Sequence, residues 1–292
     1  MGGLKSFRLS DHTITSFSDK LAKNGQNLSF YNITRVGSKI FMGTMSSGLV
    51  LFDTISKHFS RYLDVGCGVI SALSGDGKDL LYVGTDGNGV HFISVSRQRV
   101  IRTFRHDREA DSQIRSNSVY SVLVDRDGLL WIGFKTGGVD IYNPRTDQFT
   151  HLNEQVSEPI PNRIVSIFED SDHNIWLGSW EEGICKLTPK NTERTSFTAE
   201  RSHSGAIVSS FVEKPKGNIW ISTYTGLLMY NSQKRTWADI TPKNQTITQI
   251  HDTGEENTLY YSSWDNALYG LTWSQQPEQA RTIHLYNSNT PI

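Results

Sequence analysis

Residues 119–133 read VYSVLVDRDGLLWIG, and this stretch decides the fold of the chain. It begins as a strand of alternating character and turns at an Asp-Gly pair, because both residue types tolerate the positive φ of a tight turn. A second strand follows, built on the triplet Leu130-Trp131-Ile132 and closed by Gly133. Triplets of this kind, apolar–aromatic–apolar and then Gly or Ser, recur at intervals of 40 to 49 residues. Their aromatic residues are Phe41, Tyr82, Trp131, Trp176, Trp220 and Tyr260.

A period in the forties with strand-type sequence is typical of the blades of a β-propeller. In the third repeat we predict four short strands at 118–124, 129–134, 139–142 and 148–152, joined by polar turns. The other repeats follow the same order of strands and turns, and no segment has the pattern of an amphipathic helix. We therefore predict an all-β chain, a β-propeller of six four-stranded antiparallel blades.

The repeats also predict how the chain is divided. The six blades are expected at about 30–65, 66–108, 109–155, 156–200, 201–241 and 242–287. Residues 1–29 are expected to hold a stray outer strand and a loop, because Ser6-Phe7-Arg8-Leu9 resembles the fourth strand of a blade. A closed propeller must bury the open faces of its first and last blades. Either six blades close on themselves, or the chain is a fragment of a larger, about seven-bladed propeller, and the spare strand favours the fragment.

Composition excludes several classes of function. The net charge is −1 and no basic stripe is present, so the sequence does not predict nucleic-acid binding. No apolar run approaches the roughly 20 residues of a membrane span, and the start lacks a secretory signal. Given this N-terminal sequence, we expect either a cytosolic protein or an excised piece of a longer protein. Cys67 and Cys185 have no second Cys or His at metal-ligand spacing, so we predict free thiols, no metal and no cofactor.

The segment 119–133 resembles the two-component regulator propeller repeat, as do residues 164–183 and 207–230. Repeats one, two and six resemble it less, since Phe41, Tyr82 and Tyr260 replace Trp. The resemblance implies the sensor half of a hybrid two-component system, which lies outside the cytoplasmic membrane, is periplasmic and detects an oligosaccharide. The resemblance also implies a histidine kinase elsewhere in the full-length parent. A homodimer formed through the full-length sensor is possible as well. The repeat itself supplies no functional residue to carry over.

The turns after the second strands hold the candidate binding residues. Trp180, Tyr224 and Trp264 occupy equivalent positions in repeats four to six, so we expect them on one rim of the propeller. Aromatic faces stack on sugar rings, while carboxylates and amides bond sugar hydroxyls. The alternative is that these aromatic residues plug the channel or form a protein interface. The predicted ligand-binding residues are Trp180, Glu181, Tyr224, Trp264, Asp265, Asn266, Arg163 and Lys135.

Other conspicuous residues receive a structural interpretation. Trp131, Trp176 and Trp220 lie mid-strand, and we expect them to pack between adjacent blades. No two His residues have metal-ligand spacing, and His203 near Glu181 is the one weak indication of a lyase or hydrolase. We therefore predict no catalytic and no metal residue. The favoured function is a non-catalytic glycan sensor, and the alternative is a protein-interaction or dimerisation scaffold.

Overall fold

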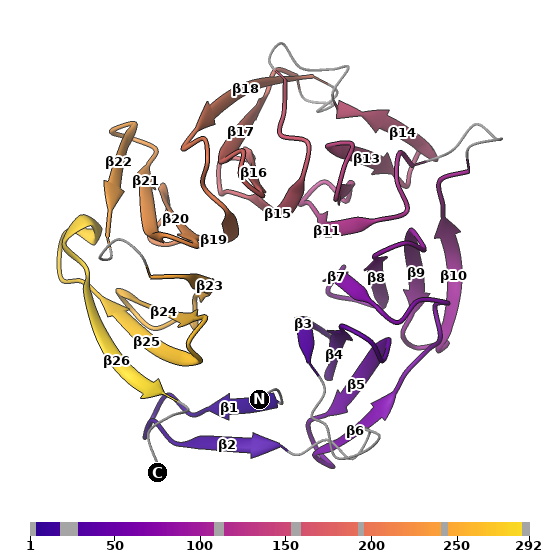
Figure 1. The fold of residues 1–292 in the computed structure, drawn as a ribbon, viewed down its shortest axis with the longest axis horizontal. Helices are drawn as coiled ribbons and strands as arrows, with labels where there is room; N and C mark the ends of the chain where they lie inside the picture. The colour runs from indigo at the N-terminus through magenta and orange to yellow at the C-terminus, as the bar shows by residue number, and fades with distance from the viewer. Residues whose placement is uncertain are drawn as a thin grey trace. The chain divides into compact units, whose positions relative to one another are not determined.

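The computed structural model describes residues 4–17, 29–107, 114–152, 159–191, 196–240 and 245–287. The chain separates into two compact units, Met1–His151 and Leu152–Ile292, which are considered one at a time. In the described residues the regular structure is almost entirely β-strand, and a short 3₁₀ turn lies at Pro277–Gln279 (Figure 1).

The first unit contains a hairpin and three four-stranded sheets, which we call blades one to three. Neighbouring strands of each sheet follow one another in sequence and pair antiparallel. The hairpin is β1 (Leu4–Phe7) and β2 (Ile14–Phe17). Blade one is β3 (Phe30–Val36), β4 (Lys39–Thr44), β5 (Leu49–Asp53) and β6 (His58–Arg61). Blade two is β7 (Ile70–Gly75), β8 (Leu80–Thr85), β9 (Val90–Ser94) and β10 (Arg99–Phe104). Blade three is β11 (Val119–Val124), β12 (Leu130–Phe134), β13 (Val139–Asn143) and β14 (Gln148–His151).

The second unit repeats the arrangement in blades four to six. Blade four is β15 (Ile164–Glu169), β16 (Ile175–Ser179), β17 (Ile184–Pro189) and β18 (Phe197–Ser202). Blade five is β19 (Val208–Glu213), β20 (Asn218–Thr223), β21 (Gly226–Asn231) and β22 (Thr236–Asp239). Blade six is β23 (Ile247–His251), β24 (Thr258–Ser263), β25 (Ala267–Thr272) and β26 (Arg281–Asn287). The predicted all-β fold of six four-stranded antiparallel blades is confirmed.

The mid-strand tryptophans form the centre of the packing, as predicted. Trp131, Trp176 and Trp220 are each at most 1% exposed. The Trp176 ring lies 5.3 Å from that of Tyr230 and 6.3 Å from that of Phe211, both of which belong to the next blade. The Trp176 ring therefore stabilises the contact between blades four and five through its large apolar surface.

The small residue after each triplet makes a close approach between blades possible. A Cβ added at Gly178 would lie 2.6 Å from Cγ1 of Val208, in the first strand of blade five. At Gly84 the equivalent distance to Cγ1 of Val119, in blade three, is 2.7 Å. Real Cβ atoms do not approach other atoms this closely, so a side chain here would force the blades apart.

A β-bulge at the start of the first strand occurs in every blade and has no obvious signature in the sequence. In blade four, Ile164 pairs with Ser179 and Ser166 with Gly178, which leaves one residue of β15 without an opposite partner. The register shifts at the same place in the other five blades. Such a bulge bends the strand and increases its twist.

Two predictions of local structure were wrong. The expected outer strand at Ser6–Leu9 is instead the hairpin β1–β2, in which Arg8 and Leu9 lie in the turn. Leu4 and Phe17 of this hairpin pack on blade one, where the Phe17 and Phe52 rings are 5.0 Å apart. The predicted end of blade four at residue 200 was also wrong, because β18 continues through Ser202. Residues 18–28 of the predicted loop lie outside the described residues.

A buried histidine in blade two gives the fold a pH dependence. His91 is 2% exposed, and its Nδ1 lies 3.0 Å from Oγ1 of Thr103. Burial, and secondly the positive charge of Arg105, lower the pKa of His91 from 6.5 to about 4. The folded protein therefore binds this proton less readily than the unfolded chain, and the His91 contribution to stability is lost as the pH falls.

We expect the free energy of unfolding to decrease as the pH falls from 6.5 towards 4, by up to about 1.4 kcal/mol per pH unit from His91 alone. Urea unfolding at several pH values would measure it. His91→Gln should give a flatter profile than the wild-type protein, since glutamine does not titrate. Parallel profiles would show that His91 does not carry the effect.

Candidate functional site

The turns after the second strands of blades four to six are held by one recurring backbone bond. Trp180 donates its backbone N–H to the carbonyl of Arg163 at 3.1 Å, and Tyr224 donates to Ile207 at 3.0 Å. Trp264 donates to Thr246 at 3.0 Å. In each case the acceptor lies just before the first strand of the same blade. The bond therefore fixes the three aromatic residues at the same edge of three successive blades.

Trp180, Tyr224 and Trp264 form a row of side chains, which we call the aromatic rim. The ring centroids of Trp180 and Tyr224 are 5.5 Å apart, with the rings nearly perpendicular at 70°. Those of Tyr224 and Trp264 are 6.3 Å apart. Trp264 is 70% exposed, and the other two are half-buried. The sequence-predicted aromatic residues are thus brought together and share an accessible surface.

Polar groups flank the aromatic rim within the second unit. Glu181 is exposed and has a φ of 77°, and Asn266 is exposed with a φ of 60°, so both occupy left-handed turn positions. Asp265 is exposed, and its Oδ1 accepts a hydrogen bond from the hydroxyl of Ser263. Arg163 is half-buried, and its backbone carbonyl is the acceptor of the bond from Trp180. These groups can donate to or accept from ligand hydroxyls.

Glu182, next to Glu181, is tied into the scaffold. Its Oε1 accepts the backbone N–H of Asn162 at 2.8 Å, and its Oε2 lies 3.5 Å from Nη2 of Arg201. Arg201 belongs to β18, beyond the predicted end of blade four at residue 200. Arg201 therefore stabilises the position of Glu182 from the edge of the sheet.

Lys135, the remaining predicted ligand-binding residue, belongs to the first compact unit and is described within that unit. There its Nζ lies 3.7 Å from Oδ2 of Asp86 and 5.5 Å from the ring centre of Tyr120. A hydrogen bond that the Lys135 ammonium donates to the hydroxyl oxygen of Tyr120, and secondly the Asp86 carboxylate, raise the pKa of Lys135. Asp86 and Lys135 occupy the turn positions that carry aromatic residues in blades four to six, so the first unit has an ion pair there.

His203, the one weak indication of catalysis in the sequence, packs against an aromatic ring. The imidazole of His203 lies 4.3 Å from the ring of Trp237, and burial lowers its pKa. Its Nδ1 is buried and has no hydrogen-bond partner among the described residues. No three His, Cys, Asp or Glu side chains in the described part of the chain gather as metal ligands. The described segments also contain no helix long and apolar enough to cross a membrane.

Comparison with protein families explains the repeat. Residues 113–136 and 159–181 match the model of the two component regulator propeller family. Two segments of the chain therefore match the two-component regulator propeller repeat. The two matches include the second strands of blades three and four, with Trp131 and Trp176, and the second match reaches Trp180 and Glu181 of the candidate site.

Solved structures share the fold of this repeat propeller. The extracellular domain of a candidate one-component system from B. thetaiotaomicron has a TM-score of 0.69 at 17% identity, covering 97% of this chain and 37% of that chain. A structure described as the extracellular domain of a candidate hybrid two-component system from B. thetaiotaomicron has a TM-score of 0.69 at 21% identity, covering 89% and 33%. PorZ, a surface component of the type-IX secretion system of Porphyromonas gingivalis, has a TM-score of 0.65 at 15% identity, covering 96% and 45%.

At these identities the likeness establishes the fold alone. The chain spans about a third of the length of the two extracellular domains, 37% and 33%. A search of curated proteins finds no match.

Proposed function

We propose that this repeat propeller is a non-catalytic sensing module of a two-component signalling protein, and that its aromatic rim binds an oligosaccharide. The observation that carries the proposal is the row of ring contacts joining Trp180, Tyr224 and Trp264 at equivalent turns. The repeats support the signalling class, because their family model is that of two-component regulators.

A sugar chain suits the chemistry of the aromatic rim. The three rings offer adjacent apolar surface, and a sugar ring has an apolar face that can stack on an aromatic ring. The carboxylates of Glu181 and Asp265 and the amide of Asn266 lie within one or two residues of Trp180 and Trp264 in sequence, where they can bond ring hydroxyls. The aromatic rim therefore favours an extended, neutral, hydroxyl-rich ligand.

We expect Trp264→Ala to weaken oligosaccharide binding by about 1–3 kcal/mol, the cost of losing a stacking side chain at a binding hot spot. The melting temperature should stay nearly unchanged, because Trp264 is 70% exposed. Calorimetric titration with an oligosaccharide panel would measure the affinity.

Ile55→Ala is the matched control, since Ile55 is also a large exposed apolar residue, at 87%, and lies in the turn between β5 and β6. It should leave binding unchanged. If the intact sensor binds no oligosaccharide of the panel, the glycan proposal fails.

The exposed surface of Trp264 also favours a second candidate, a dimerisation scaffold. Contiguous exposed apolar side chains commonly mark protein interfaces. In that case sedimentation velocity should reveal a concentration-dependent dimer, which the double variant Trp180→Ala/Trp264→Ala abolishes. A monomer at all concentrations would leave the sensor proposal as the better one.

The proposed location is outside the cytoplasmic membrane, in the periplasm, as part of a longer and about seven-bladed sensor. Support comes from the extracellular domains with the same fold, which are about three times as long as this chain. We further propose that the parent protein carries a membrane helix and a histidine kinase. The sequence of the surrounding reading frame tests both, and a frame that encodes neither contradicts them.

A further inference from the structure

One position at the end of the fourth strand fills the seam between consecutive blades. The residue here pairs with the start of the third strand, as the N–H of Tyr62 does with the carbonyl of Leu49 at 2.9 Å. In blade two it is Phe104, whose ring lies 4.8 Å from that of Tyr142 and 4.9 Å from that of Phe149, both in blade three. The corresponding residues of blades one, two, three and five are large and apolar: Tyr62, Phe104, Leu152 and Ile240.

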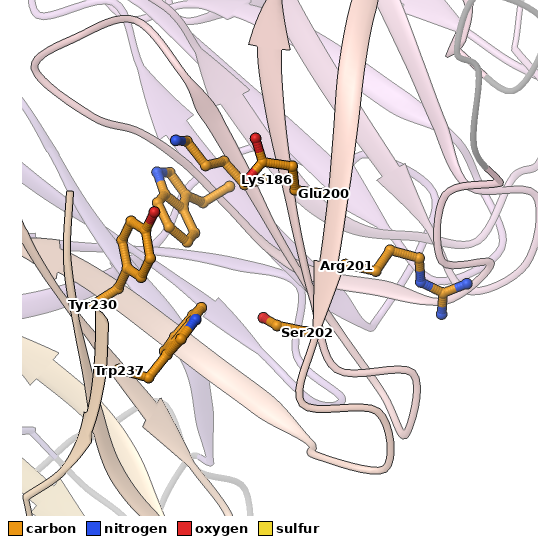
Figure 2. A pocket seen from close by; sticks show the side chains of 7 residues that line it. Lys186, Glu200, Arg201, Ser202, Tyr230 and Trp237 are labelled. Carbon is orange, nitrogen blue, oxygen red and sulfur yellow. The ribbon is translucent and has the colours of Figure 1, made fainter. Parts of the chain in front are cut away.

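Blades four and six depart from this pattern, since blade six has Asn287 at this position. Ser202 ends β18 and pairs with Ile184, just as Phe104 pairs with Val90 in blade two. A hydroxymethyl group thus replaces a ring, and a cavity of about 90 Å³ opens between blades four and five (Figure 2). Its lining consists of Trp176, Lys186, Glu200, Arg201, Ser202, Tyr230 and Trp237.

Three aromatic rings form the walls of this seam cavity. The Tyr230 ring lies 5.3 Å from that of Trp176 and 4.8 Å from that of Trp237. Trp176 and Tyr230 are buried, while Trp237 is half-buried. In Figure 2 the hydroxyl of Ser202 faces the rings of Tyr230 and Trp237. The cavity therefore has three aromatic rings on one side, and polar side chains, Ser202 among them, on the other.

The charged residues lie around the cavity with opposite signs. Lys186 and Glu200 are directly opposite each other across β17 and β18. The Nζ of Lys186 lies 5.7 Å from the ring centres of both Trp176 and Tyr230. Arg201 points away from the rings in Figure 2, towards its ion pair with Glu182. One cation and one anion beside the aromatic rings leave the cavity suited to a neutral guest that can also exchange a hydrogen bond.

We propose that the seam cavity binds a single phenolic ring. The ring would enter edge-first into the space that corresponds to the position of the Phe104 ring in blade two. There it would lie between Tyr230 and Trp237, which are equivalent to Tyr142 and Phe149. Its hydroxyl would remain near Lys186 and Glu200. A closed apolar cavity of roughly 150 Å³ takes up a whole benzene molecule. The smaller and open seam cavity accommodates part of a ring and leaves the substituted end in solvent.

Titration with p-cresol, followed by the indole N–H signals of Trp176 and Trp237 in NMR spectra, tests this proposal. The wild-type protein should show saturable shifts at both signals. Ser202→Phe fills the cavity with the residue type of blade two and should weaken binding at least tenfold. Ser202→Leu, which copies blade three, should do the same and serves if the phenylalanine variant does not fold. Ser202→Ala keeps the cavity open and should bind as the wild-type protein does.

The aromatic rim supplies an independent control. Trp180→Ala/Trp264→Ala should bind p-cresol unchanged, and Ser202→Phe should keep the oligosaccharide affinity of the wild-type protein, so each proposal can fail without the other. Three results would overturn the seam proposal: no saturable shift, wild-type affinity for p-cresol in both filled variants, or tighter binding of tetramethylammonium than of p-cresol. Tighter binding of tetramethylammonium would identify the cavity as a site for cations, a place that the ammonium group of Lys186 takes when no ligand is bound.

Discussion

Trp176→Ala should lower the free energy of unfolding by about 3–5 kcal/mol, the usual cost of removing a large buried aromatic side chain. Trp176 is 1% exposed and packs on Phe211 and Tyr230 of blade five. Its Nε1 also donates to Oδ2 of Asp170 at 2.8 Å. The substitution would leave a cavity in the seam and remove the partner of a buried carboxylate at the same time.

Urea unfolding monitored by circular dichroism measures this loss. Trp264→Ala is the matched control, because it removes the same side chain from a position that is 70% exposed. The control should cost less than about 1 kcal/mol. A loss below about 1 kcal/mol for Trp176→Ala would contradict the seam role assigned to the tryptophan.

The strands of the regular blades could be predicted from the sequence, because the local strand and turn preferences agree with the propeller fold. In blade three the predicted strands at 118–124, 129–134, 139–142 and 148–152 differ from the observed ones by one residue at an end. Turn residues fix these ends, and strand alternation fixes the faces. The burial of Trp131, Trp176 and Trp220 follows from the same pattern, since each stands between branched apolar neighbours.

The N-terminal hairpin was missed because it lacks an aromatic triplet. A weaker signal was present: Gly2-Gly3-Leu4 and the residues that follow resemble the stretch from Gly137-Gly138-Val139 onwards. His12, with a φ of 58°, matches Asp147, with a φ of 59°, in the turn between the third and fourth strands. Neither residue is glycine, so the left-handed turn position is not evident from residue type.

The candidate site was predictable in position but not in its contacts. Equivalent turn positions placed Trp180, Tyr224 and Trp264 at one edge, whereas the distances between their rings depend on the spacing of neighbouring blades. The same reasoning included Lys135, whose side chain instead pairs with Asp86 in the first unit. Repeat position alone does not say which partner a long, charged side chain selects.

The other large effect is expected at the aspartate that precedes each buried tryptophan by six residues in blades three and four. Asp125 accepts the Nε1–H of Trp131 at 2.8 Å, as Asp170 does for Trp176. Asp170 is 3% exposed, and its Oδ1 also accepts the backbone N–H groups of Asp172 at 3.0 Å and Asn174 at 2.8 Å. One carboxylate therefore closes the first hairpin of the blade and orients the tryptophan.

Asp170→Ala should cost about 2–4 kcal/mol, because it leaves the buried indole N–H and several turn donors without an acceptor, at about 1–3 kcal/mol for each donor that water cannot reach. Asp170→Asn should cost less, since its amide keeps one oxygen acceptor. The control is Asp172→Ala in the same turn, whose carboxylate forms an exposed ion pair with Lys216 at 3.2 Å and should contribute less than about 1 kcal/mol. Urea unfolding of the three variants ranks them. Equal losses of unfolding free energy for Asp170→Ala and Asp172→Ala would contradict the role assigned to Asp170. They would mean that the turn, and not the bond to the tryptophan, accounts for the effect of the aspartate on stability.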